Sequence, residues 1–141
     1  MSKLNFKPYT TESRQVFASM LDDYFNNDLK EKMSFDRIKL VTARIEYELK
    51  FYDMGLYMLS SAVLSTDNAE LAGFIWFQTD TPENPWCLKP GWGFIREIYI
   101  HPSLRRQGLG EAAAREAINL LRKSGANNIY LTAKSQGSRA F

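Results

Sequence analysis

The sequence has little of several residue types and patterns that would define a function class. It contains one cysteine, Cys87, and one histidine, His101, so no disulfide forms within the chain and we expect no metal. No stretch approaches the roughly 20 apolar residues that span a bilayer, and no apolar run near residue 1 suggests a signal peptide. The formal net charge is only +2, which is far less basic than is usual for nucleic-acid binding. We therefore expect a cytoplasmic protein without a membrane or nucleic-acid partner.

The overall composition is that of an ordinary soluble domain. The chain has 141 residues, of which 45% are hydrophobic and 24% charged, and this is enough to bury one core. No repeat, low-complexity tract or linker divides it. The sequence predicts a single domain over residues 1–141.

The first part of the chain predicts a short strand and two helices. Residues 3–8 form the strand, and Thr10 or Thr11 caps a helix that residues 26–28 break. Its apolar face is Val16, Phe17, Met20, Leu21, Tyr24 and Phe25. Ser34 and Asp36 start the second helix, and Gly55 ends it. Its buried stripe is Ile38, Val41, Ile45, Leu49 and Tyr52.

The rest of the chain is typical of a mixed sheet. Residues 56–64 and 71–78 predict an antiparallel hairpin, and residues 80–93 an ordered surface loop. A strand over 94–100, a helix over 109–123 that ends at Gly125, and a strand over 128–133 follow. The last two strands should be parallel, joined by a right-handed crossover. The fold class is therefore α/β, with a mixed (α+β) sheet.

A glycine loop with two arginines stands before the third predicted helix. Gly108 and Gly110 remove side chains where the first N–H groups of the helix lie exposed, and Arg105 and Arg106 add positive charge. This combination favours a phosphate or pyrophosphate site. The alternative is a structural turn whose arginines lie in solvent.

Three nucleotide-binding motifs compete for this loop. A Walker A loop is excluded because Glu111 and Ala112 follow the second glycine, where Lys and Ser/Thr are needed. The run GLGEAA fits G-x-G-x-x-A, but seven residues separate Ile100 from Gly108 and residues 128–134 contain no acidic residue for a ribose. The run FIREIYIHPSLRRQGLG resembles the coenzyme A signature of the GNAT superfamily of N-acetyltransferases. Its parts are Ile98-Tyr99-Ile100, Pro102 and Arg105-Arg106-Gln107-Gly108-Leu109-Gly110.

The resemblance implies a GNAT-like acyl-CoA N-acyltransferase fold and acetyl-CoA as cosubstrate. N–H groups from Arg106 to Gly110 would hold the pyrophosphate, and the pantetheine arm would pair with the backbone of Ile98 and Ile100. The implied coenzyme-binding residues are Ile98, Tyr99, Ile100, Arg105, Arg106, Gln107, Gly108, Leu109, Gly110 and Ser135.

Acetyl transfer to an amine needs a base, and strand 94–100 offers candidates. By two-residue alternation Glu97, Tyr99 and His101 share one side, while Ile98 and Ile100 face the core. Glu97 is the candidate general base and Tyr99 a second catalytic candidate; the alternatives are a surface carboxylate paired with Arg96, and for His101 a capping or surface role. The N–H of Ile98 or Ile100 would stabilise the oxyanion. Because the family transfers acetyl groups directly, Cys87 is not needed as a nucleophile.

The chain departs from the family pattern at its end. The tail from Ser135 to Phe141 fits the start of a family helix, and the tyrosine that commonly protonates the thiolate would follow it. We expect a C-terminally truncated fold that lacks the last two strands. Strand 128–133 would then be an exposed edge, which predicts a homodimer that covers it.

The acceptor implied by the resemblance is a primary amine on a small molecule or a peptide. Asp22, Asp23 and Tyr24, with Trp86 and Trp92, would suit a cationic amine; the alternative is a solvated helix face and a packed loop. The predicted function is N-acetyltransfer from acetyl-CoA. A non-catalytic acyl-CoA-binding module of the same fold is the alternative.

Overall fold

The computed structural model describes residues 4–61, 71–84 and 87–131. Over these residues the chain runs through one strand, two helices, three strands, one helix and a last strand, with short 3₁₀ or π-helical turns between some of them. In order the elements are β1 (Leu4–Pro8), η1 (Thr11–Ser13), α1 (Arg14–Asp23), η2 (Tyr24–Asp28), α2 (Phe35–Phe51), β2 (Met54–Ser61), β3 (Leu71–Thr79), β4 (Gly93–Ile100), η4 (Pro102–Leu104), α3 (Leu109–Lys123) and β5 (Ile129–Leu131). Among the described residues, no helix is long and apolar enough to cross a bilayer.

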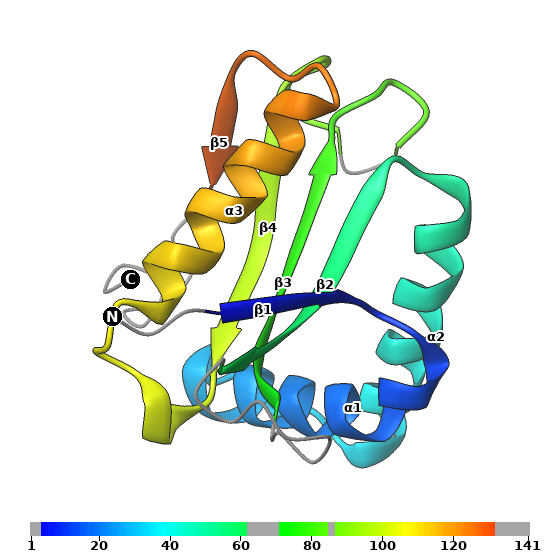
Figure 1. The fold of residues 1–141 in the computed structure, drawn as a ribbon. Coiled ribbons are helices and arrows are strands. Elements are labelled where there is room, and N and C mark those ends of the chain that lie inside the picture. Colours follow the sequence, from blue (N-terminus) through cyan, green and yellow to red (C-terminus); the bar gives the residue numbers. More distant parts are fainter. Residues whose placement is uncertain (1–3, 62–70, 85–86, 132–141) are drawn as a thin grey trace.

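The strands form one mixed sheet between two layers of helix. Their order is β1-β2-β3-β4-β5, and β4 and β5 are parallel while the other neighbours are antiparallel. Helix α3 lies against one face, and α1 and α2 lie on the other side (Figure 1). The predicted α/β class, the hairpin and the parallel pair are confirmed.

Each face of the sheet buries its own apolar cluster. Phe74 of β3 packs with Phe17 and Ile38 on the side of α1 and α2, and its neighbour Ile75 packs with Ala113 and the rest of α3 on the other side. Because helices cover both faces, β3 is buried at seven consecutive positions instead of alternating between buried and exposed. The sheet is therefore a rigid support for whatever β4 carries.

The first helix continues where residues 26–28 were predicted to break it. That prediction is wrong: the chain runs on through Asp28 as the π-helical turn η2. Asn26 donates from Nδ2 to Asp22 Oδ1 at 2.7 Å, and Asn27 donates to Asp23 Oδ1 at 2.6 Å. These side-chain hydrogen bonds to the preceding turn hold the asparagines in helical backbone. Turn η2 then presents Tyr24 and Asp28 to β4 and its loop.

Gly55 does not end the second helix, so this prediction is also wrong. Helix α2 starts at the predicted cap, Ser34, whose hydroxyl accepts from Arg37 N, but it ends at Phe51, and Gly55 lies within β2. A Cβ on Gly55 would lie 2.6 Å from Cζ of Phe77. The glycine is explained by an aromatic ring packed across it, not by a helix C-terminus.

The loop after β3 is organised around one buried carboxylate, Asp80. It accepts hydrogen bonds from Gln78 Nε2 at 2.7 Å, from the N–H groups of Leu88 and Lys89 at 3.0 Å, and from the Tyr130 hydroxyl at 2.5 Å. Burial alone would raise the pKa of Asp80, but the hydrogen bonds from Tyr130 and Gln78 outweigh it and lower that pKa. Asp80 thus ties the loop to β5, as expected for an ordered loop.

The far edge of the described sheet is β5. Strand 128–133 is confirmed over Ile129–Leu131, although it starts one residue later than predicted, and residues 132 and 133 lie outside the described ones. Leu131 is 43% exposed, whereas Ile129 is partly buried against the α3 cluster. The homodimer stays a prediction. The proposed contacts of Ser135 and the tail up to Phe141 also lie outside the described residues.

Candidate active site

A β-bulge in β4 places two consecutive side chains on the same face of the sheet. Trp76 pairs with Glu97, but Phe77 pairs with Ile95, so Arg96 is an extra residue. Arg96 and Glu97 consequently both lie on the side of α1 and α2, where they line one pocket. Bulges re-aim side chains in this way and are frequent next to active sites.

Beyond the bulge the predicted alternation holds. Glu97 and Tyr99 face the α1 and α2 side, where each contacts a side chain from that region, while Ile98 and Ile100 pack with the α3 cluster. This confirms the predicted faces.

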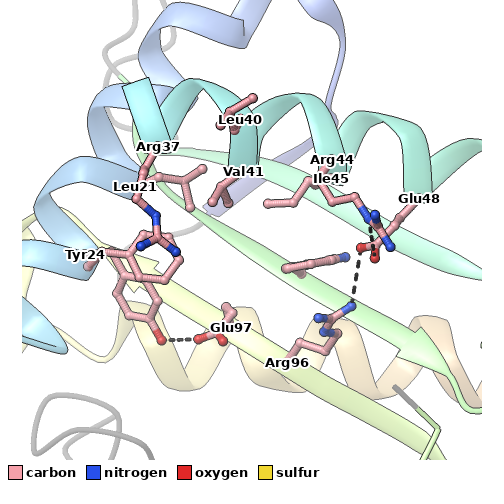
Figure 2. Close-up of a pocket in the computed structure, with 12 residues that line it drawn as sticks. Leu21, Tyr24, Arg37, Leu40, Val41, Arg44, Ile45, Glu48, Arg96 and Glu97 are labelled. Carbon is pink, nitrogen blue, oxygen red and sulfur yellow. Dashed lines mark hydrogen bonds and ion pairs between the residues drawn. The ribbon is translucent and has the colours of Figure 1, made fainter. Parts of the chain in front are cut away.

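The pocket has a volume of about 540 Å³ and lies between α2, the end of α1 with η2, and strands β3 and β4 (Figure 2). Its apolar lining is Leu21, Phe25, Leu40, Val41, Ile45 and Trp76. Its polar lining is Tyr24, Arg37, Arg44, Glu48, Arg96 and Glu97. A few polar groups in an apolar concavity are typical of a small-molecule site.

Glu97 is the carboxylate best placed for chemistry in this pocket. It lies on the pocket wall, is partly exposed, and accepts a hydrogen bond from the Tyr24 hydroxyl (Figure 2). That contact fixes its orientation from the opposite wall. A partly buried carboxylate that faces a pocket and is oriented by a hydrogen bond can accept a proton from a bound amine.

Arg96 forms the other half of the bulge and anchors a buried polar cluster. Its guanidinium carbon lies 3.7 Å from the Trp76 ring centroid, and Nη1 donates to Gln78 Oε1 at 3.2 Å. Nη1 also lies 3.9 Å from the carboxylate of Glu48, which is 2% exposed and bonded at 3.4 Å to Arg44. Burial lowers the pKa of Arg96, although Glu48 and Glu97 oppose the shift. The charge of Glu48 is therefore compensated from both sides.

Tyr99 and His101 are placed differently from Glu97. The buried Tyr99 donates its hydroxyl to Asp23 Oδ2 at 2.5 Å, and burial together with this hydrogen bond raises the pKa of Tyr99. Its catalytic role stays a prediction. His101 is exposed, and its Nδ1 accepts from Ser103 N at 3.2 Å, so it caps η4. This is the capping role that the sequence left open.

The glycine loop leads into the first turn of α3, where backbone N–H groups have no partner within the helix. Arg106 and Gly108 have left-handed backbone, with φ of 64° and 79°. The first helical hydrogen bond runs from Ala112 N to Gly108 O at 3.0 Å, so the N–H groups of Leu109, Gly110 and Glu111 precede the helical ladder. A Cβ on Gly108 would meet nothing within 4 Å. The loop therefore offers donors, positive dipole and open space to an anion.

Arg105 links this loop to η2. Its Nη1 and Nη2 donate to the two carboxylate oxygens of Asp28 at 2.9 and 2.6 Å, and its Nε donates to the carbonyl oxygen of Ile100 at 2.8 Å. All three nitrogens are thus engaged, and the arginine fixes the end of β4 against η2. Arg106, in contrast, is exposed beside Gln107.

Comparison with known proteins decides the family. The model of the acetyltransferase (GNAT) family matches residues 18–141. The chain belongs to this family. Among the curated proteins, none matches the chain.

Solved structures of GNAT proteins share the fold. A predicted acetyltransferase with acetyl-CoA from Clostridium acetobutylicum is 16% identical with a TM-score of 0.73, over 97% of this chain and 84% of that one. A GNAT acetyltransferase from Staphylococcus aureus is 11% identical with a TM-score of 0.69, over 93% and 73%. An aminoglycoside N-acetyltransferase in complex with coenzyme A is 11% identical with a TM-score of 0.68, over 94% and 78%.

In this GNAT protein the two parallel strands, as far as residue 131, pair over the first part of β4. The pairing joins Gly93 to Ile129, Phe94 to Tyr130 and Ile95 to Leu131. Within the described part of the chain, Ile98 and Ile100 pair only with β3. Their outer backbone edge lies next to the glycine loop, where the family resemblance predicts the pantetheine arm.

The acceptor residues predicted from sequence are mostly elsewhere. Tyr24 lines the pocket, but Asp22 and Asp23 accept hydrogen bonds from Asn26 and Asn27 and are not in its lining. Trp92 packs against Tyr130, with ring centroids 6.1 Å apart. Trp86 lies outside the described residues.

The GNAT pocket instead takes charged residues from α2 that the sequence reasoning missed. These residues are Arg37, Arg44 and Glu48. They stand at helical spacing beside Val41 and Ile45, and this shared face was the available signal.

Proposed function

We propose that this protein transfers an acetyl group from acetyl-CoA directly to a primary amine. The observation that carries the proposal is the geometry of β4. One strand bears Glu97 in the pocket and, three residues later, ends at Ile100 beside the glycine loop. The acceptor pocket and an anion site are thereby joined by one rigid segment.

The loop residues fit the pyrophosphate of coenzyme A. The N–H groups from Arg106 to Gly110 would hold it, with Gln107 and Leu109 in the same run. The left-handed Gly108 and the open space at its missing Cβ support this, because a side chain there would stand in the path of the ligand. Arg106 adds charge from its exposed position. Arg105 contributes by holding Ile100 and η2 in place.

The chain's own groups supply the rest of the reaction. The thioester of acetyl-CoA is the acetyl donor. Glu97 takes a proton from the acceptor ammonium, and the neutral amine attacks the carbonyl carbon. The C–S bond then breaks, the nitrogen loses its second proton, and the leaving thiolate takes up one proton. The N–H of Ile98 or Ile100 donates to the oxyanion that forms. The products are the N-acetyl amine and, after protonation, the coenzyme A thiol.

Amine-dependent thiol release tests this function. The full chain is incubated with acetyl-CoA and a panel of primary amines, and free thiol and acetylated amine are measured together. We expect the two products in equal amounts, and none with quaternary ammonium analogues, which carry no transferable proton. Coenzyme binding without amine-dependent release would instead support the non-catalytic acyl-CoA-binding module.

A further inference from the structure

The charges of the acceptor pocket are mostly satisfied within the protein. Glu48 lies between Arg44 at 3.4 Å and Arg96 at 3.9 Å, and Glu97 is bonded to Tyr24. Arg37 differs from these residues. Within the described residues, no carboxylate lies within ion-pair distance of its guanidinium. One cation on the pocket wall is therefore available to a ligand.

Arg37 stands at the same end of the pocket as the proposed base. It starts from the first turn of α2, and Figure 2 shows it at the end of the pocket that holds Tyr24 and Glu97, whereas Arg44, Glu48 and Arg96 lie at the other end. A ligand whose amine approaches Glu97 thus meets Arg37 with a neighbouring group. A planar guanidinium binds a carboxylate through two parallel hydrogen bonds.

The rest of the pocket lining indicates the chemistry of the remaining part of the ligand. Val41 and Ile45 of α2 and Trp76 of β3 line the pocket, so the body of the ligand meets apolar surface. A second positive charge on the ligand, close to its amine, would meet Arg37. This argues against the cationic acceptor expected from Asp22 and Asp23, which do not line the pocket.

We propose that the acceptor is an α-amino acid with an apolar side chain. Its amine lies at Glu97, its carboxylate at Arg37, and its side chain against Val41, Ile45 and Trp76. This inference rests on the proposed acetyl transfer for the role of the amine. The carboxylate contact itself can be tested by binding alone.

The experiment compares L-phenylalanine with L-phenylalaninamide, in which an uncharged amide replaces the carboxylate. Binding of each to the full chain is measured by calorimetry in excess coenzyme A, where no turnover occurs. We expect the acid to bind about tenfold or more tightly than the amide, because charge-assisted hydrogen bonds to Arg37 are lost in the amide. The amide has the less basic amine, so a pocket that selected only for a neutral amine would favour the amide.

Variants at Arg37 connect the preference to one residue. Arg37→Ala should abolish the preference, and Arg37→Glu should reverse it. Arg115→Ala is the matched control, because Arg115 is also exposed but lies on α3, away from the pocket lining and paired with Glu111. Arg37 is itself exposed, so its loss leaves the core intact.

Each outcome decides the proposal. Equal binding, preference for the amide, a preference that survives Arg37→Ala, or no binding of either compound at millimolar concentration would overturn it. Failure of the acetyl-transfer proposal gives a different result: the acid is preferred through Arg37, yet no thiol is released from acetyl-CoA. Release with the amide but not the acid would overturn the acceptor class and keep the transferase.

Discussion

Replacing Glu97 with glutamine is expected to lower kcat for amine-dependent thiol release by about 10²–10⁴-fold, the usual contribution of a general base. Glutamine has the same shape and can still accept a hydrogen bond from Tyr24, so the pocket should persist. It cannot accept a proton from the acceptor ammonium. The measurement is steady-state thiol release, with coenzyme A binding measured on the same protein.

The matched control for this substitution is Tyr24→Phe. It removes the donor that orients Glu97 but keeps the carboxylate, so its rate should fall much less than that of Glu97→Gln. Coenzyme A affinity should be unchanged in both variants. A Glu97→Gln enzyme with the rate of the wild type would show that another group takes the proton. A parallel loss of coenzyme affinity would assign Glu97 a structural role.

Of the substitutions considered, Gly73→Ala is expected to lower the free energy of unfolding most. Gly73 lies in β3 opposite Ile100, and a Cβ there would lie 1.9 Å from the carbonyl oxygen of Tyr99 and 3.1 Å from Cα of Ile100. Both are backbone atoms, so no rotamer change relieves the overlap and β4 must move. Overpacking of this kind costs about 3 kcal/mol or more. For a domain of this size, this corresponds to a fall in Tm of about 10 °C.

Gly125→Ala separates this overlap from ordinary glycine strain. Gly125 has a φ of 108°, but a Cβ on it would meet nothing within 4 Å. Alanine there should cost only the left-handed backbone strain of about 1–2 kcal/mol. Thermal unfolding of both variants checks the contrast. Equal Tm values would mean that the close approach of β3 and β4 at Gly73 has no energetic consequence.

The sequence was sufficient for features that local signals determine. Three such features are the glycine loop, helix α3 and the shared face of Glu97 and Tyr99. Each depends on residues that are close to one another in the sequence. The family signature in residues 94–110 lies within this same local segment. These predictions therefore survive without knowledge of tertiary contacts.

The bulge could not be predicted, because it depends on how β4 pairs with β3. Strict alternation along the strand would put the side chains of Arg96 and Glu97 on opposite faces of the sheet. The bulge in the pairing with β3 instead puts both on the same face, in one pocket. Gly55 shows the same limit. Read locally it ends a helix, but the ring of Phe77, more than 20 residues later, explains it.

The prediction of which charged residues face the acceptor was wrong for a related reason. The acidic pair Asp22 and Asp23 suggested a cationic acceptor. In the structure, however, Asp22 accepts a hydrogen bond from Asn26, and Asp23 accepts one from Asn27. Which charges remain available is decided by their partners, and only the three-dimensional structure supplies those. The availability of Arg37 is visible only there.

Thermal unfolding with coenzyme A tests the central claim most directly, because the glycine loop must bind its pyrophosphate before any transfer occurs. The full chain is unfolded with acetyl-CoA, coenzyme A and NAD, each in excess. A ligand at about 100 times its Kd adds roughly 2.7 kcal/mol, which raises Tm by on the order of 5–15 °C. We predict this rise with both coenzyme A species and none with NAD. No shift with either coenzyme A species, or an equal shift with NAD, would contradict the assignment of residues 106–110 as the coenzyme A site.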